Sequence, residues 1–359
     1  MVGIQRPHWV TRAATFFCCV SLVVDVVRCR SEHAPPPPAP SGIRFFDGFS
    51  DYAVLQRAPA QAALYGQLGT GGTGATVRLS TTTSGASTSD DGVEVVVAAT
   101  VSDGGQWKVL LPPHPAGGDF TVTATCTGCN SGPHSAKLLN VTFGDVVYCS
   151  GQSNMWLPLL HTLTRNQTLA SLANGKYANI RLMAGNSQDS NTFPWKTAAA
   201  AATDGSCSYI THGGNVAGCS LFDFSAVCYY YAEALTDKFE AAGQRAPPLG
   251  LISTAIGGSM IEEWLPNSTI ADCVGASVAP HNQKLWDQNI VPFLDMTVWG
   301  WLWCKCSARD CMCHTCVLSH TVMASLFARV CLKIKGRITC IVLWATRFRV
   351  SVTDAKWWN

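Results

Sequence analysis

The sequence has few charged residues and no excess of either sign. Asp, Glu, Lys and Arg make up 13% of the 359 residues, and the formal net charge is +2. That share is about half of the usual one for soluble domains. A chain without concentrated positive charge lacks the electrostatic footprint of a nucleic-acid-binding protein. We therefore expect a neutral partner and no binding of nucleic acid.

The sequence also lacks an apolar run long enough to span a membrane. The apolar run AATFFCCVSLVVDVV follows Arg6 and Arg12, is short, and contains Asp25. This layout is typical of a signal peptide, which we predict over residues 1–33; a membrane anchor is the alternative. Basic residues interrupt every long apolar window near the other end of the chain. We expect no stable membrane insertion.

Cysteine, in contrast, is abundant, with 17 residues. Three lie in the leader, seven between Cys126 and Cys273, and seven in the last part of the chain. In an oxidising compartment the middle set should form disulfides, and the pairs closest in sequence are Cys126–Cys129 and Cys207–Cys219. Cys149 is either a small core residue or a bridge partner.

Three N-glycosylation sequons begin at Asn140, Asn166 and Asn267. Together with the leader and the cysteines, they predict passage through the secretory pathway to the outside of the cell or to a lysosomal lumen. The sequence leaves the oligomeric state open.

The chain divides into regions of different composition. Residues 34–42 are rich in proline and predict an extended linker. Residues 43–142 contain short β-branched runs separated by Gly, Ser and Pro turns, which predicts an all-β, sandwich-like module. Residues 143–303 alternate strand and helix patterns, with the best helix at 222–242 and a buried strand from Pro248. This alternation favours an α/β fold with a mostly parallel sheet, whose sites lie at strand carboxyl ends.

One such strand end carries a candidate nucleophile. The segment VTFGDVVYCSGQSNMWLP (141–158) changes from a buried strand to a turn at Ser150-Gly151. Ser153 follows directly, where its hydroxyl would be exposed and backbone amides could face a developing oxyanion. The alternative is an ordinary Gly-Ser turn.

A second strand end supplies a candidate oxyanion donor. The strand from Pro248 leads to Gly257-Gly258. Glycine lets a backbone N–H approach a reacting group with no side chain in the path, so the Gly258 amide could act beside that of Ser153. A tight turn without catalytic function is the alternative.

These motifs resemble the sialate O-acetylesterase family, carbohydrate esterases of the SGNH-hydrolase type. GDVVYCSGQSNM is similar to the family's nucleophile block, and PLGLISTAIGGSMIEEW is similar to its Gly-Gly-Thr-x-Ile-Glu-x-Trp block, with Ser259 in the Thr place. FSAVCYYYAEAL, Val54-Leu-Gln-Arg and Gly105-Gln-Trp also recur in the family. The resemblance covers residues 43–303 and implies a three-layer α/β/α domain after the β module.

The resemblance also implies roles for particular residues. Ser153 would be the nucleophile and Gly258 an oxyanion donor, while Gln152 and Asn154 would contact substrate. Glu262 and Trp264 would shape the pocket wall, where Trp264 either stacks on a sugar ring or is buried in the core. The implied reaction is hydrolysis of acetyl esters on sialic acid or related sugars, without a metal or organic cofactor.

The family pattern stops at Cys304, and residues 304–359 form a divergent, Cys-rich tail. The family's Asp-x-x-His element, which supplies the base, and its Gln-Gly-Glu segment are both missing. Asp310 and His314 have one residue too many between them; the other candidates for the base are His161, His212, His281 and His320. The C-x-C pairs of the tail do not match zinc spacing, so we expect no metal.

Half of the expected active site is therefore present in the sequence. We hypothesise that unrelated coding sequence replaces the C-terminal region. The alternatives to an active esterase are a catalytically inactive glycan-binding protein or truncated pseudo-enzyme, and a β-sandwich adhesion module.

Overall fold

Strand β9 (Ser135–Gly151) connects the two parts of the fold. The computed structural model describes residues 42–81, 95–130, 132–185, 193–205, 219–271, 283–304, 328–334 and 337–345. In the first half of β9 buried and exposed residues are mixed, whereas every residue from Val141 to Gly151 is buried. The strand therefore changes from a sheet with one solvated face to a sheet covered on both faces.

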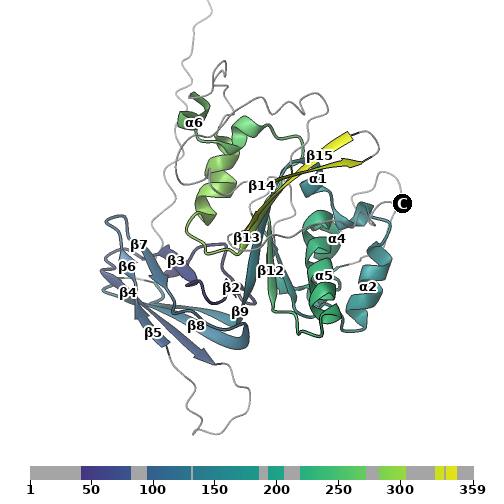
Figure 1. Cartoon of the computed structure of the whole chain (residues 1–359). Coiled ribbons are helices and arrows are strands. Elements are labelled where there is room, and N and C mark those ends of the chain that lie inside the picture. The colour runs from purple at the N-terminus through teal and green to yellow at the C-terminus, as the bar shows by residue number, and fades with distance from the viewer. Residues whose placement is uncertain are drawn as a thin grey trace, which may run out of the picture. The chain divides into compact units, whose positions relative to one another are not determined.

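The first half of β9 pairs antiparallel with β8, one of eight strands that precede β9 in sequence (Figure 1). These strands are β1 (Arg44–Phe45), β2 (Val54–Gln56), β3 (Ala63–Gln67), β4 (Gly74–Thr81), β5 (Val95–Ala98), β6 (Thr100–Val101), β7 (Gln106–Leu110) and β8 (Gly117–Thr127). One sheet has the order β1-β3-β7-β6, and β5-β4-β8-β9 pair in the other, with β2 parallel to β9. Trp107 from the first sheet and Val122 from the second are both buried in one core.

The second half of β9 lies in a mixed sheet of order β11-β10-β12-β9-β13-β15-β14. Its other strands are β10 (Ile180–Ala184), β11 (Phe193–Thr197), β12 (Leu249–Ser253), β13 (Gly300–Cys304), β14 (Ala328–Ile334) and β15 (Arg337–Ala345). The four central strands β10, β12, β9 and β13 are parallel. Their carboxyl ends therefore share one edge of the sheet.

Helical segments follow these strands. They are α1 (Ser153–Trp156), η1 (Leu159–His161), α2 (Arg165–Ala173), α3 (Ala198–Ala201), α4 (Ser220–Asp223), α5 (Ala226–Ala241), η2 (Ile261–Trp264), α6 (Asn267–Ala271), the π-helical turn η3 (Trp286–Ile290) and η4 (Val291–Phe293). Residues of α1, α2, α4 and α5 pack on one face of the sheet with Val147 and Leu251. Ile290 and Phe293 pack on the other face, in the same core as the N-terminal strands.

Most predicted elements are present, with differences at their boundaries. The helix predicted at 222–242 is interrupted, because Phe224 has an extended conformation and the Ser225 hydroxyl accepts the Cys228 amide as the cap of α5. The predicted boundary between residues 142 and 143 falls inside β9. The helical pattern of residues 143–303 ends in the short turns η3 and η4, with a proline in the second.

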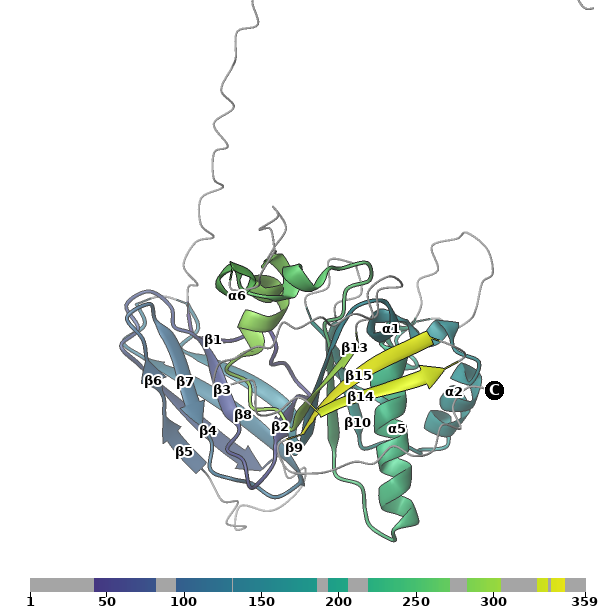
Figure 2. The same ribbon diagram turned by 45° about the horizontal axis from the view of Figure 1, so that its top comes forward.

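The tail contains strands that the sequence did not predict. Strand β15 pairs antiparallel with β13, and β14 pairs with β15, so both extend the sheet beyond β13 (Figure 2). The predicted signal peptide and most of the predicted linker lie outside the described residues. Within the described part of the chain, no helix is both long and apolar enough to cross a bilayer.

Candidate active site

The candidate nucleophile follows the carboxyl end of β9. Gly151, the last residue of the strand, has a φ of 128°, a value that favours glycine, and there the chain turns sharply. Gln152 follows with an extended backbone and accepts the Met155 amide at 2.8 Å, which starts the short helix α1. The sequence thus places Ser153 at the first helical position after a buried strand.

Ser153 is exposed at this position. The amides of Ser153 and Asn154, in the first turn of α1, donate to no acceptor among the described residues. First-turn amides have no partner within their own helix. Ser153 thus lies on a turn that also carries two amides with no acceptor in the described part of the chain.

The predicted Gly257-Gly258 turn lies against α1. The Ile256 amide donates to the Gly151 carbonyl at 3.0 Å, which joins the loops that follow β12 and β9. A Cβ on Gly257 would lie 3.1 Å from the Trp156 indole, so the turn packs closely on the helix that carries Ser153. Gly258 is exposed, has a φ of +76°, and has open space where a side chain would stand.

Hydrogen bonds of Ser259 hold the Gly257-Gly258 turn in place. The Ser259 hydroxyl donates to the Ile256 carbonyl at 2.8 Å and accepts the Trp264 indole N–H at 2.9 Å. Trp264 is 2% exposed, and its ring packs edge-on against Trp303 at 5.1 Å. Trp264 thus lies in the core behind the turn, while Glu262 is half-buried on η2.

Two further predicted substrate contacts flank Ser153. Asn154 is exposed, and Gln152 is half-buried. The Gln152 Oε1 atom is buried and accepts no hydrogen bond in the described structure. A buried acceptor without a donor is costly, so a substrate hydroxyl that reached Gln152 Oε1 would remove that cost.

A buried polar network that the sequence analysis missed lies beneath the two loops. Thr254 Oγ1 is 2.6 Å from the Tyr148 hydroxyl and 3.0 Å from Ser150 Oγ. The Tyr148 hydroxyl donates to the Asn289 carbonyl, and Asn289 Nδ2 donates to the Thr254 carbonyl at 3.1 Å. Burial raises the pKa of Tyr148, so this hydroxyl stays protonated. The signal was available, because Ser150 and Thr254 are polar residues at the ends of neighbouring buried strands.

The Val54–Arg57 segment contacts β9 through an ion pair and a hydrogen bond. Arg57 binds the carboxylate of Asp145 through two nitrogens, at 2.8 and 3.0 Å, and Gln56 Oε1 accepts the Val146 amide at 3.0 Å. Asp145 raises the pKa of the Arg57 guanidinium. The Val54–Arg57 segment thus fixes the start of the buried half of β9.

Disulfides hold other parts of the fold. The predicted Cys126–Cys129 bridge is present, and Cys149 in β9 is bonded to Cys228 in α5. Cys219 is also disulfide-bonded, while Cys207, its predicted partner, lies outside the described residues.

The described residues do not include most candidates for the base. His161 is exposed at the end of η1, whereas His212, His281, His320 and the Asp310–His314 pair lie outside the described residues. Among the residues described, no group of three or more His, Cys, Asp or Glu side chains could hold a metal ion. The sequon residues Asn166 and Asn267 are exposed, and Asn140 is half-buried in β9.

The fold has a mixed α/β architecture. It matches the crystal structure of a carbohydrate acetylesterase from Xanthomonas citri with a TM-score of 0.50 and 24% identity, over 73% of this chain and 50% of that one. No family model matches the chain.

The sequence is similar to one named group of enzymes. It is 30% identical to the sialate O-acetylesterase of Rattus norvegicus over 235 residues, or 65% of this chain and 39% of that protein. It is 28% identical to the sialate O-acetylesterase of Homo sapiens over 276 residues, or 73% of this chain and 48% of that protein. The predicted resemblance to sialate O-acetylesterases is therefore confirmed, and this chain spans less than half the length of these relatives.

Proposed function

We propose that this chain is a carbohydrate O-acetylesterase of the secretory pathway, with Ser153 as its nucleophile. The observation that carries the proposal is the exposed Ser153 on the turn after a central parallel strand, packed beside the Gly257-Gly258 turn. The similarity to sialate O-acetylesterases supports the reaction class. The disulfides support an oxidising compartment, because such bonds persist outside the cytosol.

The proposed reaction has two steps. The Ser153 hydroxyl attacks the acetyl carbonyl carbon and loses its proton to a base, while the carbonyl oxygen gains negative charge. The amides of Ser153 and Gly258 donate to that oxygen, and collapse of the intermediate releases the sugar hydroxyl and leaves acetyl-Ser153. Water then attacks the acetyl group, which releases acetate and regenerates the hydroxyl. Gln152 and Asn154 are proposed to contact the sugar.

Attack by the Ser153 hydroxyl needs a base that takes its proton. His161 is the described candidate, and the family's Asp-x-x-His element is absent from the sequence. The alternative to this proposal is a catalytically inactive protein that binds acetylated glycans without hydrolysing them.

Hydrolysis of p-nitrophenyl acetate by the 359-residue chain, expressed in a secretory host, separates the two functions. We expect Ser153→Ala to lower kcat/KM by at least about 100-fold, because the covalent step is lost. Ser135→Ala, an exposed serine at the start of β9, is the matched control and should leave the rate unchanged. If the unaltered chain is no faster than Ser153→Ala, the esterase proposal is wrong for this chain.

A further inference from the structure

Four buried polar residues form a hydrogen-bonded network beneath the two loops of the candidate site. Tyr148, Ser150 and Asn289 are 0% exposed, and Thr254 is 1% exposed. Ser150 contacts Thr254, Thr254 contacts Tyr148, and Tyr148 contacts the Asn289 carbonyl. The proposed reaction uses none of these groups, so the network needs an explanation of its own.

The hydrogens of this network all point the same way. Each hydroxyl has one hydrogen to donate. Tyr148 gives its hydrogen to the Asn289 carbonyl, which can only accept, so Tyr148 accepts the hydrogen of Thr254 at 2.6 Å. Ser150 must then supply the hydrogen of its 3.0 Å contact with Thr254. Each donor thus has one acceptor, and a satisfied buried network of this kind holds its members in a single arrangement.

Asn289 closes the network and ties a third element to the two strand ends. Its Nδ2 atom donates to the Thr254 carbonyl at 3.1 Å, while its own carbonyl accepts from Tyr148. Asn289 lies in the π-helical turn η3, and such turns occur frequently at functional sites. Its Oδ1 atom is buried and has no hydrogen-bond partner in the described structure, which costs stability. This cost favours a role in positioning over a role in stability alone.

The network lies directly behind the two turns of the candidate site. Ser150 is three residues before Ser153, and Thr254 is four residues before Gly258. The Thr254 amide also donates to the Cys149 carbonyl at 3.0 Å, so the backbones of the two strand ends are joined at the same place. Because side chains alternate along a strand, Ser150 and Cys149 point to opposite faces of β9. The network and the disulfide of Cys149 therefore hold the end of β9 from both faces.

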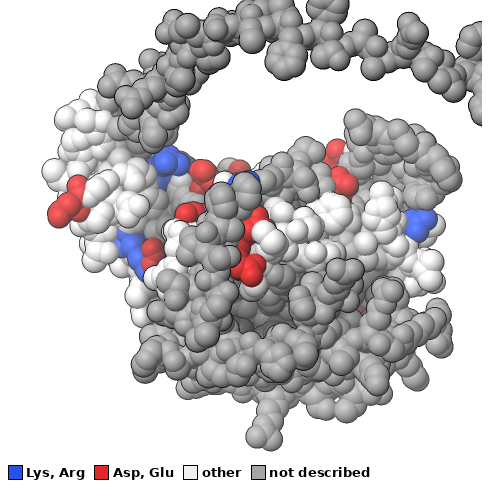
Figure 3. Space-filling view, turned by 90° about the horizontal axis from the view of Figure 1, so that it is seen from above, with Lys and Arg blue, Asp and Glu red and all other residues white. Residues whose placement is uncertain are grey.

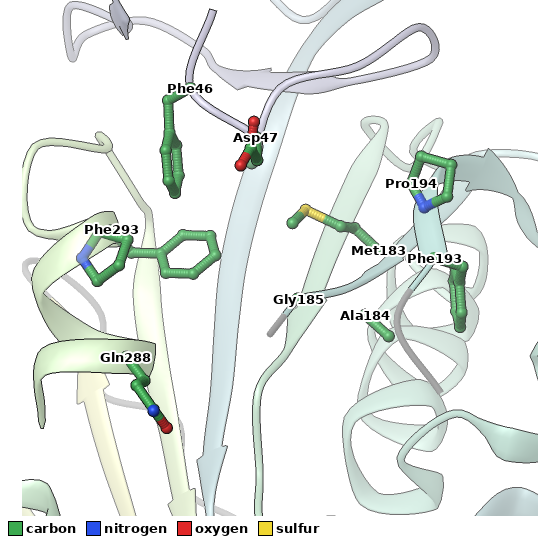
Figure 4. A pocket seen from close by; sticks show the side chains of 11 residues that line it. Phe46, Asp47, Met183, Ala184, Gly185, Phe193, Pro194, Gln288 and Phe293 are labelled. Carbon is green, nitrogen blue, oxygen red and sulfur yellow. The ribbon is translucent and has the colours of Figure 1, made fainter. Parts of the chain in front are cut away.

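Aromatic rings cover the network. The Tyr148 ring centroid lies 4.2 Å from that of Trp301 and 5.2 Å from that of Phe293. Phe293 also lines a cavity of about 470 Å³, where its side chain faces those of Phe46 and Met183 (Figure 4). The lining of this cavity contains none of the four polar residues. Their hydrogen bonds are therefore shielded from solvent, where they are electrostatically stronger than at the surface.

The two turns carry no charged residue of their own. Residues 148–157 and 253–260 contain no Asp, Glu, Lys or Arg. In the view from above, the acidic and basic side chains lie at the described surface (Figure 3). The polar side-chain contacts of the network are thus made by neutral groups.

We propose that this network sets the distance between the Ser153 hydroxyl and the Gly258 amide, and that Thr254 is its central positioning residue. The inference rests on the proposed function and names a residue that acts through Ser153 and Gly258 without touching the substrate. Thr254 takes part in three of the hydrogen bonds, two through its hydroxyl and one through its carbonyl. Oxyanion donors act only when they are already in place, and a misplacement of about 1 Å can lower a rate by about 100-fold.

Replacement of Thr254 by Val removes the hydroxyl and keeps the shape of the side chain. With p-nitrophenyl acetate and the full-length chain, we expect Thr254→Val to lower kcat by at least about 10-fold and to leave KM within about 2-fold, because the lost contact acts in the transition state. Thr254→Ser keeps the hydroxyl and should retain kcat to within about 3-fold. Ser150→Ala removes only the end of the network, so its kcat should lie between those of the two Thr254 variants.

Thr142→Val is the matched control. Thr142 is 2% exposed in β9, and its hydroxyl donates to the Gly118 carbonyl at 2.7 Å, away from the candidate site. This variant should lose a similar amount of stability in urea but keep the kcat of the unaltered chain. Full kcat in Thr254→Val, or an equal loss of kcat in Thr142→Val or Thr254→Ser, would overturn the proposal.

Hydrogen–deuterium exchange gives a second readout that does not depend on hydrolysis. Thr254→Val should speed exchange in peptides that cover residues 149–157 and 254–260, whereas Thr142→Val should not. If the unaltered chain is no faster than Ser153→Ala, the esterase proposal fails, and the exchange rates alone decide whether the network holds the two turns. Intact hydrolysis with unchanged kcat and unchanged exchange in Thr254→Val refutes only the positioning role.

Discussion

Removal of the Cys149–Cys228 bridge should destabilise the chain far more than removal of Cys126–Cys129. The two bridges have similar Cα–Cα distances of 6.0 Å but close loops of very different length, with sequence separations of 79 and 3. In the chain-entropy treatment, the stabilisation is roughly 4.5 kcal/mol for the long loop and roughly 2 kcal/mol for the short one. The expected difference is thus about 2.5 kcal/mol.

The comparison uses two double variants, Cys149→Ala/Cys228→Ala and Cys126→Ala/Cys129→Ala. Guanidinium unfolding followed by tryptophan fluorescence gives the free energy of unfolding of each. All four cysteines are buried, so the cavities left by their sulfur atoms add to the loss of stability in both variants.

Equal losses of stability from the two double variants would refute this reasoning. In that case loop length would not control the contribution of these bridges. The end of β9 would then depend on the packing around Cys149 for its position, and the bridge would have only a local effect.

Two further predictions concern charged groups. Arg57→Ala should lower the free energy of unfolding by about 3 kcal/mol, because it leaves the Asp145 carboxylate buried without its partner. Arg57→Lys keeps the charge but not the bidentate geometry, so it should lower the free energy of unfolding by less. Equal stability of the unaltered chain and both variants in urea would contradict this prediction. Burial raises the pKa of Glu233 from 4.5 to about 7, so the folded chain holds a proton that the unfolded chain has lost, and stability should fall as pH rises from about 4.5 to about 7. Glu233→Gln should remove this part of the pH dependence in urea titrations at pH 5 and 7.5, and an unchanged slope would show that Glu233 is not its source.

Much of the fold could be predicted because local patterns determine it. The strand from Pro248 and the end of α5 follow from buried apolar runs and from Gly243, which has a φ of +70°. The interruption before α5 could not be found by periodicity, since Phe224 fits the apolar pattern and is buried although its backbone is extended. The spacing of apolar residues indicates which residues are buried, and the residues before and after Phe224 are buried alike. The spacing therefore gives no sign that the helix is interrupted there.

The sequence predicted those site residues that combine a suitable reactive group with a position just after a buried strand. Ser153 and Gly258 stand out because each follows a buried strand with glycine beside it. The Cys149–Cys228 bridge joins residues 79 positions apart, and the Asn289–Thr254 hydrogen bond joins residues 35 positions apart, with no local signal for either. Their pairing depends on which strands become neighbours, and a single sequence does not state that order.

The continuity of β9 has a consequence for how this protein can change. One unbroken strand, β9, runs from the N-terminal sheets to the turn that carries Ser153. Recombination that replaced the N-terminal region alone would therefore join two unrelated sequences in the middle of β9. Both halves would then need a new register for their hydrogen bonds. The two regions are therefore expected to be inherited together, and change near Ser153 to be constrained by partners in the N-terminal sheets.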